Sequence, residues 1–325
     1  MDCIPEIVVV AGPPGSGKSS SIQEMENAGY VRINRDLLGG SLKDSSNVYQ
    51  EMWRQFTMGK RAFVLDNVYA TKESRAQVLE IGRDMGLPVR MIWIDASAEQ
   101  AQFFAARRQV QRYGHVLRPA EYKQKPYKDD PNMFPPAAQF AYWKRVERPE
   151  VAEGFTSVVF QPVTITLGSE YVNKAVIFDY DGTLRVTKSG RHSPRDPADV
   201  QVLPGRAEKI RKLVAEGYLI LGASNQSAIS KDPSDSEYLS EADAIACFNE
   251  TNRQLGLPIH VLYSTERGGV PQSYLPKPCP GMGAQLIEQY KLDPAQCLYV
   301  GDMTKDATFA KRCGFQFKLA NEFFA

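Results

Sequence analysis

The stretch EIVVVAGPPGSGKS, residues 6–19, decides the fold of the first half of the chain. The apolar run Ile7–Ala11 predicts a buried strand, and the residues after it match the pattern GxxxxGK[ST] at every fixed position. Glycines at this spacing let successive backbone N–H groups point at a phosphate chain, and the helix that follows adds its positive N-terminal end. This order predicts a nucleotide site; a merely structural glycine turn is the weaker alternative.

The residue types in this loop assign the expected contacts to ATP. Lys18 is expected to reach the β- and γ-phosphates, and Ser19 to hold Mg²⁺. The expected ATP-binding set comprises Gly12, Pro13, Pro14, Gly15, Ser16, Gly17, Lys18, Ser19 and Ser20. Further along, Asp36 follows a short strand, where a carboxylate suits deprotonation of a hydroxyl acceptor. A helix N-cap is an alternative role for Asp36, and the two roles are compatible.

Short apolar runs alternate with longer amphipathic stretches along the whole chain, a rhythm typical of βαβ units and parallel sheets. In the first half the expected strands are Glu6–Ala11, Ala62–Asp66, Val89–Asp95 and Ser157–Thr166. In the second half they are Ala175–Asp179, Tyr218–Ser224, Pro258–Tyr263, Cys297–Gly301 and Phe315–Phe317. We therefore predict an α/β chain of two doubly wound parallel-sheet domains, residues 1–168 and 169–325.

A second motif opens the second half, where the strand Ala175–Phe178 runs into Asp179-Tyr180-Asp181-Gly182-Thr183. Two carboxylates at this spacing, just past a buried strand, project from the carboxyl edge of the sheet, where α/β proteins bind ligands. The motif resembles the nucleophile motif of the haloacid dehalogenase superfamily. Turn-forming acids are the alternative, but the other motifs of that superfamily follow in order: Ser224-Asn225, Lys277, and Asp302 with Asp306.

This resemblance implies a phosphatase that forms an aspartyl phosphate. Asp179 is the expected nucleophile, and Asp181 the expected general acid and then base. The expected phosphate-holding residues are Thr183, Ser224, Asn225 and Lys277, and the expected metal set is Asp179, Asp181, Asp302 and Asp306, beside Ser19 in the first half.

Both halves also resemble one family, the bifunctional polynucleotide kinase-phosphatases. The resemblance rests on Ala28–Val31, Asn34–Gly39, Leu65–Asn67, Ser74-Arg75 and Ala152–Phe155 in the first half, and on Lys188–Gly190, Ala215–Tyr218, Ser224–Gln226 and Glu322–Phe324 in the second. It implies Asp36 as general base on a 5′-hydroxyl and Arg35, Asp66 and Asn67 as acceptor contacts. It also implies a lid arginine, for which Arg108 matches best, with Arg107 beside it. Phage-type members carry an arginine where this chain has Gly39 and Gly40.

The resemblance implies an ATP- and Mg²⁺-dependent 5′-hydroxyl kinase fused to a 3′-phosphatase. Its partners would be DNA or RNA ends, which a ligase then seals. The choice between DNA and RNA stays open, because no reader of a 2′-hydroxyl is identifiable. One alternative is a small-molecule kinase fused to a small-molecule phosphatase, although residues 264–278 lack the Cys/His zinc loop frequent in such phosphatases. A binding module without catalysis is disfavoured because every reactive residue is present.

Charge and cysteine usage add two expectations. The net charge is only +1, but residues 107–128 hold seven cations against the single acid Glu121, and three tyrosines are interleaved with them. This composition suits binding of a single-stranded polynucleotide and an ordinary solvated loop equally well. Four further cations suit a basic rim for nucleic acid at the second site as well as each of them suits ordinary solvated surface: Arg185, Lys188, Arg191 and Arg195. The five scattered cysteines and the short apolar runs favour a cytoplasmic protein with no membrane segment. The oligomeric state is not indicated.

Overall fold

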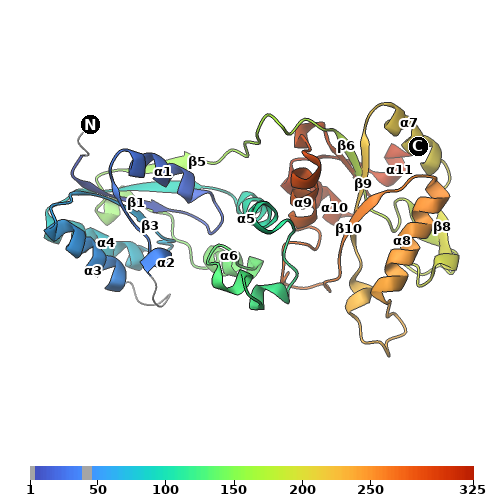
Figure 1. The fold of residues 1–325 in the computed structure, drawn as a ribbon, viewed down its shortest axis with the longest axis horizontal. Helices are drawn as coiled ribbons and strands as arrows, with labels where there is room; N and C mark the ends of the chain where they lie inside the picture. The colour runs from blue at the N-terminus through green and yellow to red at the C-terminus, as the bar shows by residue number, and fades with distance from the viewer. Residues whose placement is uncertain (1–3, 39–45) are drawn as a thin grey trace. The chain divides into compact units, whose positions relative to one another are not determined.

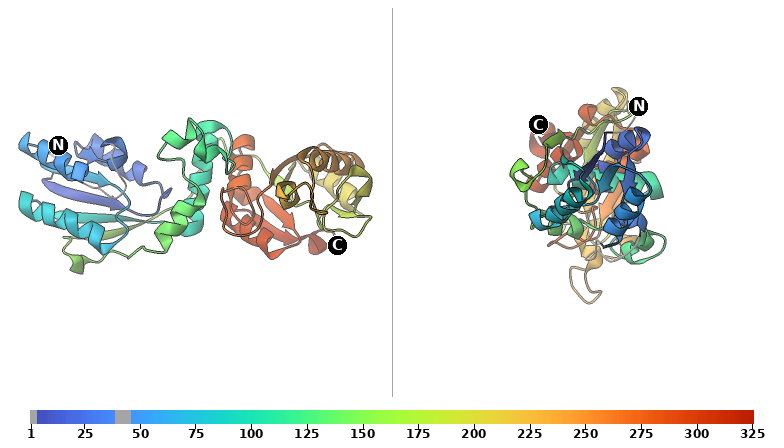
Figure 2. Two further views of the ribbon diagram at one scale, coloured as in Figure 1. Left: turned by 90° about the horizontal axis from the view of Figure 1, so that it is seen from below. Right: turned by 90° about the vertical axis from the view of Figure 1, so that its left-hand side faces the viewer.

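The computed structural model describes residues 4–38 and 46–325, apart from the side chains of Ser20, Asp36 and Leu37. It forms two compact units, one of Met1–Ala105 with Asp129–Ile165 and one of Ala106–Lys128 with Thr166–Ala325 (Figure 1). Residues 106–128 therefore pack with the second half of the chain. Figure 2 shows each unit from two further sides. The domain boundary expected between residues 168 and 169 stays a prediction.

The first unit is built on a five-stranded parallel sheet in the order β2-β3-β1-β4-β5. Its strands are β1 (Glu6–Ala11), β2 (Val31–Ile33), β3 (Ala62–Asp66), β4 (Val89–Asp95) and β5 (Val158–Pro162). Its helices are α1 (Lys18–Asn27), α2 (Arg35–Leu38), α3 (Ser46–Thr57), α4 (Lys72–Met85) and α6 (Pro136–Trp143); α5 (Ala98–Tyr113) runs on into the second unit.

Every residue of β1 is buried because helices cover both faces of the sheet. Side chains alternate along the strand, so Ile7 and Val9 pack with residues of α3, α4 and α6. Val8 and Val10 pack on the other face with Ile22 of α1. Continuous apolar strands and amphipathic helices thus explain the layered core that the sequence pattern predicted.

The second unit has a five-stranded parallel sheet in the order β10-β9-β6-β11-β12. Its strands are β6 (Ala175–Phe178), β9 (Leu219–Asn225), β10 (His260–Ser264), β11 (Leu298–Gly301) and β12 (Gln316–Leu319). A small antiparallel pair, β7 (Arg185–Thr187) and β8 (Val200–Val202), follows the second motif. The helices are α7 (Arg206–Ala215), α8 (Glu241–Leu255), α9 (Gly281–Tyr290), α10 (Thr304–Cys313) and α11 (Ala320–Phe323).

The predicted fold class, two parallel-sheet α/β domains, is confirmed. Three details differ. The short elements α6, β7 and β8 were not predicted, since each is too short to show a hydrophobic period. The sequence pattern predicts a helix over Ser236–Leu255, but helix α8 begins at Glu241, because the Ser240 hydroxyl accepts a hydrogen bond from the Asp243 amide at 3.0 Å and caps the helix there. Residues 113–136 show no clear hydrophobic period in the sequence, which predicts a loop, and they contain two 3₁₀ turns.

Within residues 4–38 and 46–325, no helix combines the length and the apolar composition that crossing a bilayer requires. Four of the five cysteines are buried free thiols: Cys247, Cys279, Cys297 and Cys313. Cys3 lies outside the described residues.

Candidate active sites

The glycine loop between β1 and α1 needs its glycines for backbone shape. Gly12, Gly15 and Gly17 have φ of 149°, 86° and 86°, a region that L side chains rarely adopt. A Cβ on Gly12 would also lie 2.8 Å from the Ile94 carbonyl oxygen, and a Cβ on Gly15 would lie 2.8 Å from that of Ala101. The backbone of the loop is therefore closely packed against Ile94 and Ala101. The loop leads directly into the N-terminus of α1.

Polar groups fill and brace this loop. The Lys18 ammonium donates to the carbonyl oxygens of Gly12 at 3.1 Å and Pro13 at 3.0 Å, so it folds back over the loop. Gln139 of α6 donates to the carbonyl oxygen of Pro14 at 2.8 Å. The buried Ser16 hydroxyl has no hydrogen-bond partner within the described residues. A lysine ammonium over the loop, an unsatisfied hydroxyl and the positive end of a helix together suit the phosphate chain of a nucleotide.

The expected acceptor residues lie at the same edge of the sheet. Asp66 ends β3 opposite Val10 of β1, and it forms an ion pair with Arg32. Asn34 donates to the Asp66 carbonyl oxygen at 2.8 Å, and the Arg35 amide donates to the Asn67 side chain at 3.3 Å. The ends of β2 and β3 are thus held together beside the glycine loop. The side chain of Asp36, the expected base, and that of Ser20 lie outside the described part of the structure.

The two arginines considered for the lid differ in their surroundings. Arg107 forms an ion pair with Glu288 and donates to the Tyr171 hydroxyl at 3.3 Å, all within the second unit. Arg107 is therefore already bound by an acid and a phenol. Arg108, the next residue of α5, stays the prediction for the lid.

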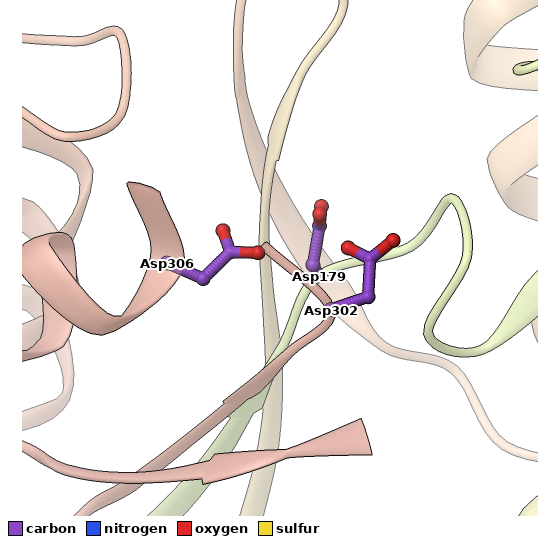
Figure 3. Close-up of side chains that lie close together, drawn as sticks. All are labelled: Asp179, Asp302 and Asp306. Atoms are coloured by element: carbon purple, nitrogen blue, oxygen red, sulfur yellow. The ribbon is translucent and has the colours of Figure 1, made fainter. Parts of the chain in front are cut away.

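Three carboxylates meet at the carboxyl edge of the second sheet (Figure 3). Asp179 directly follows β6, Asp302 directly follows the neighbouring β11, and Asp306 lies in the first turn of α10. One oxygen from each lies within 4.8 Å of the others. Hard oxygen donors at this spacing fit a Mg²⁺ ion. Asp181, which the sequence reasoning also gave to the metal, is not part of this cluster of three.

A buried lysine neutralises part of this negative charge. The Lys277 ammonium lies 3.0 Å from Asp179 Oδ1 and 2.8 Å from Asp306 Oδ1, and it donates to the Tyr299 hydroxyl at 2.8 Å. Burial disfavours its charge, but the two carboxylates outweigh burial and raise the pKa of Lys277. Burial also raises the pKa of Asp179; Lys277 opposes this, and the carboxylates of Asp306 and Asp181 add to it. One lysine thus leaves the acids short of positive charge, which a divalent cation would supply.

Asp181 is held at both oxygens. Arg185 donates from Nε to Oδ1 at 2.8 Å, and Gln226 donates from Nε2 to Oδ2 at 2.7 Å. The expectation that Arg185 belongs to an exposed basic rim is wrong, since the residue is only 1% exposed. It starts β7, and its guanidinium also donates to Thr251 of α8 at 3.0 Å. Of the other rim cations, Arg195 pairs with Glu237, whereas Lys188 and Arg191 are exposed.

The expected phosphate-holding residues surround Asp179 and Asp181, with differing partners. The Thr183 hydroxyl is buried and has no hydrogen-bond partner in the described part of the chain. A hydroxyl in this state can donate a hydrogen bond to a phosphate oxygen. The Ser224 hydroxyl accepts from Gln226 at 3.0 Å. Asn225 pairs with the backbone of Lys277 in both directions, at 2.9 and 3.0 Å, and so orients the lysine loop.

The sequence reasoning gave no role to Gln226, Tyr299 or Gln139. Gln226 lies in the segment Ser224–Gln226 that carries the family resemblance, so its position was a usable signal. Tyr299 and Gln139 reach their partners across 22 and 125 residues, and no local pattern marks them.

These geometries define the class: an α/β domain with a glycine-loop nucleotide site, joined to an α/β domain whose carboxylate cluster resembles that of the haloacid dehalogenase phosphatases. Comparisons agree. Residues 174–324 match the family model described as polynucleotide kinase 3 phosphatase, and residues 7–125 match an AAA domain model. Together the two models match parts of both halves of the chain, and they agree with the sequence resemblance to the bifunctional polynucleotide kinase-phosphatases.

Among curated relatives, the bifunctional polynucleotide phosphatase/kinase of Schizosaccharomyces pombe is 30% identical over 154 residues, which cover 47% of this chain and 32% of that protein. The chain thus spans about a third of that relative. The D-glycero-beta-D-manno-heptose-1,7-bisphosphate 7-phosphatase of Haemophilus ducreyi is 28% identical, covering 45% of this chain and 81% of that one. A chain in the solved structure of a Pnkp1/Rnl/Hen1 RNA repair complex is 14% identical, and the match covers 98% of this chain and 96% of that chain. The TM-score of this match is only 0.32.

Proposed function

We propose that this chain repairs nucleic-acid ends, phosphorylating 5′-hydroxyls with ATP and removing 3′-phosphates from DNA or RNA. The observation that carries the proposal is the buried Lys277 bridging Asp179 and Asp306 beside Asp181, in a chain whose other unit holds Lys18 over a glycine loop. The Lys277 cluster and the glycine loop each suit transfer of a phosphoryl group. In this proposal one transfer acts on the 3′ end and the other on the 5′ end of a strand.

In the phosphatase, an Asp179 oxygen attacks phosphorus and the bond to the sugar 3′-oxygen breaks. Asp181 gives its proton to that oxygen, so the strand leaves as an alcohol and Asp179 carries the phosphoryl group. Asp181, now a carboxylate, takes a proton from a water that attacks the same phosphorus. Inorganic phosphate leaves and Asp179 is regenerated. Lys277, Thr183 and Ser224 hold the non-bridging oxygens, and Arg185 with Gln226 aims Asp181.

In the kinase, Asp36 removes the proton of the 5′-hydroxyl, whose oxygen attacks the γ-phosphorus as ADP leaves. Lys18, now turned onto carbonyl oxygens of its own loop, swings to the β- and γ-phosphates once they enter. Arg35, Asp66 and Asn67 position the acceptor strand. Arg108 neutralises charge on the transferring group, as a guanidinium near it would.

Mg²⁺ would be held by Ser19 in the first site and by Asp179, Asp302 and Asp306 in the second. When bound, it offsets charge on the phosphate oxygens and on the clustered carboxylates. A ligase acting downstream would join the ends that this chain produces.

The deciding assay offers one oligonucleotide with a 5′-hydroxyl and a 3′-phosphate, as DNA and as RNA, with ATP and Mg²⁺. We expect the strand to gain a 5′-phosphate and lose its 3′-phosphate. A protein that leaves both ends unchanged yet dephosphorylates a small sugar would refute the proposal.

A second candidate, a small-molecule phosphatase, is favoured by the 28% identity to a heptose bisphosphate phosphatase. Added salt separates the two. Turnover of an oligonucleotide should fall steeply as salt rises because counterions compete for its phosphates, whereas turnover of a heptose bisphosphate should change little.

A further inference from the structure

Helix α5 (Ala98–Tyr113) contributes residues to both compact units. In the first unit it packs against the glycine loop: a Cβ on Gly15 would lie 2.8 Å from the Ala101 carbonyl oxygen and 3.2 Å from the Ala105 Cβ. Arg108, the prediction for the lid arginine, is the next position on this face of the helix, because residues three and four apart are neighbours along a helix surface. The direction of the Arg108 side chain therefore depends on the rotation of α5 about its own axis.

A different face of α5 is bound within the second unit. Arg107 forms an ion pair with Glu288 of α9, and its guanidinium donates to the Tyr171 hydroxyl at 3.3 Å. Tyr171 donates in turn to the other carboxylate oxygen of Glu288 at 2.7 Å, which closes a ring of three side chains. Shortly after the helix, the Val116 amide donates to Gln285 of α9 at 3.0 Å. Helix α9 thus holds α5 at Arg107 and the segment after α5 at Val116.

The ion pair of Arg107 with Glu288 is largely shielded from water. The side chain of Arg107 is 15% exposed and that of Glu288 only 8%. An ion pair at this depth adds little net stability because both charges lose water, but its charge-assisted hydrogen bonds fix one geometry. Glu288 has no part in the phosphatase reaction proposed above, so the effect of this ring of side chains is on the orientation of α5.

We propose that Glu288, a residue of the phosphatase domain, is a positioning residue for the kinase: by holding Arg107 it sets the rotation of α5 and directs Arg108 at the transferring phosphoryl group. The inference rests on the proposed function and adds to it a dependence of the 5′ reaction on the second unit. Consecutive side chains on a helix point about 100° apart. With Arg107 fixed toward Glu288, Arg108 is therefore the arginine that stays on the face of Ala101 and Ala105.

The test measures both reactions of the full chain after Glu288→Gln, which keeps the size of the side chain and removes its charge. We expect kcat for 5′-phosphorylation to fall by about 10- to 100-fold, the range for a slightly misplaced catalytic group. KM for ATP and the 3′-phosphatase rate should be nearly unchanged. The matched control, Glu208→Gln, removes an exposed acid of α7 in the same unit and should change neither reaction.

A double-mutant cycle determines whether Glu288 acts through Arg108. Arg108→Ala should lower kcat for 5′-phosphorylation by about 10³-fold, because the guanidinium stabilises charge on the transferring group. Adding Glu288→Gln to Arg108→Ala should lower kcat no further, since the group to be positioned is gone. A merely structural role for Glu288 would give the same loss in both backgrounds.

Tyr171→Phe is a milder second variant in case Glu288→Gln does not fold, because it removes only the hydroxyl that bonds to both Arg107 and Glu288. It should lower kinase kcat by about threefold, the effect of one hydrogen bond, and only when Arg108 is present. Three results overturn the inference and leave the proposed function standing: an unchanged kinase kcat in the variant that folds, an equal loss of the 3′-phosphatase rate, or a loss that adds to that of Arg108→Ala. A wild-type protein that phosphorylates no oligonucleotide refutes the proposed function and this inference with it.

Discussion

Arg185 donates from Nε to Oδ1 of Asp181 at 2.8 Å, so the expected general acid of the phosphatase is held by a buried arginine four residues along the chain. The guanidinium lies 5.0 Å from the ring centre of Phe248 and 5.4 Å from that of Tyr180, which fix its plane. Its other hydrogen bond goes to Thr251, and the second oxygen of Asp181 goes to Gln226. The side chain of Asp181 is therefore held in one orientation by Arg185 and Gln226.

We predict that Arg185→Lys lowers phosphatase kcat by about 10²-fold with little change in KM, the size of effect expected when a catalytic group is misplaced by about 1 Å. The reason is that a lysine ammonium cannot reach Asp181 and Thr251 together, as the guanidinium does. With p-nitrophenyl phosphate, whose leaving group needs no proton, transfer of the phosphoryl group to Asp179 should keep its rate. Hydrolysis of the phosphorylated enzyme, for which Asp181 activates water, should become slower. Acid-quenched samples should then contain more phosphorylated protein than wild type. Arg253→Lys, an exposed substitution on α8, is the control. An unchanged kcat would show that Arg185 only packs.

Arg185 also shows where sequence reasoning ends. The glycine loop and the Asp179–Asp181 motif could be predicted because the backbone shape and reactive groups lie within a few consecutive residues. Lys277, Asp302 and Asp306 were expected from the order of the superfamily's motifs, and the carboxyl ends of parallel strands bring Asp302 beside Asp179. Arg185 was assigned to an exposed rim because its burial depends on Thr251, 66 residues away, and on the short strands β7 and β8. Likewise, no local pattern predicted the partners of the buried Arg75, which lie at residues 147 and 153.

The two chemistries should be separable by single substitutions. Lys18→Ala should reduce 5′-phosphorylation to background and leave the 3′-phosphatase rate within twofold, because Lys18 belongs to the glycine loop of the first compact unit and the phosphatase residues belong to the second. Asp179→Asn should do the reverse, since an amide cannot act as the nucleophile. Both rates are measured on one doubly labelled oligonucleotide. Loss of both activities in either variant would contradict the assignment of one reaction to each unit.

Arg75→Ala should lower the free energy of unfolding of the first unit by about 3–5 kcal/mol, because it leaves the Glu153 carboxylate without its buried partner. All three tryptophans, Trp53, Trp93 and Trp143, lie in that unit, so tryptophan fluorescence during urea denaturation follows it selectively. The exposed Arg83→Ala on the same helix is the control and should change stability by less than about 0.5 kcal/mol. Equal, small losses in the two variants would mean that the Arg75 network does not stabilise the fold.

The basic segment of residues 107–128 supports a prediction about salt. In the structure, Arg107 and Arg118 pair with Glu288 and Glu241, whereas Lys123, Lys125 and Lys128 are exposed. If these three lysines contact the phosphates of a single strand, replacing them with glutamine removes the release of about three counterions. The slope of log KM against log salt should then fall by about 2, at roughly 0.7 per contact.

The matched control replaces three exposed lysines outside this segment, Lys60, Lys212 and Lys318, and so makes the same change in net charge. A general electrostatic effect would lower the slope equally in both triple variants, whereas a binding segment lowers it only in the first. Running the titration separately for 5′-phosphorylation and 3′-dephosphorylation identifies which reaction uses the segment. Because residues 106–128 pack with the second unit, we expect the larger change in 3′-dephosphorylation. Equal slopes in wild type and the first triple variant would exclude the segment from strand binding.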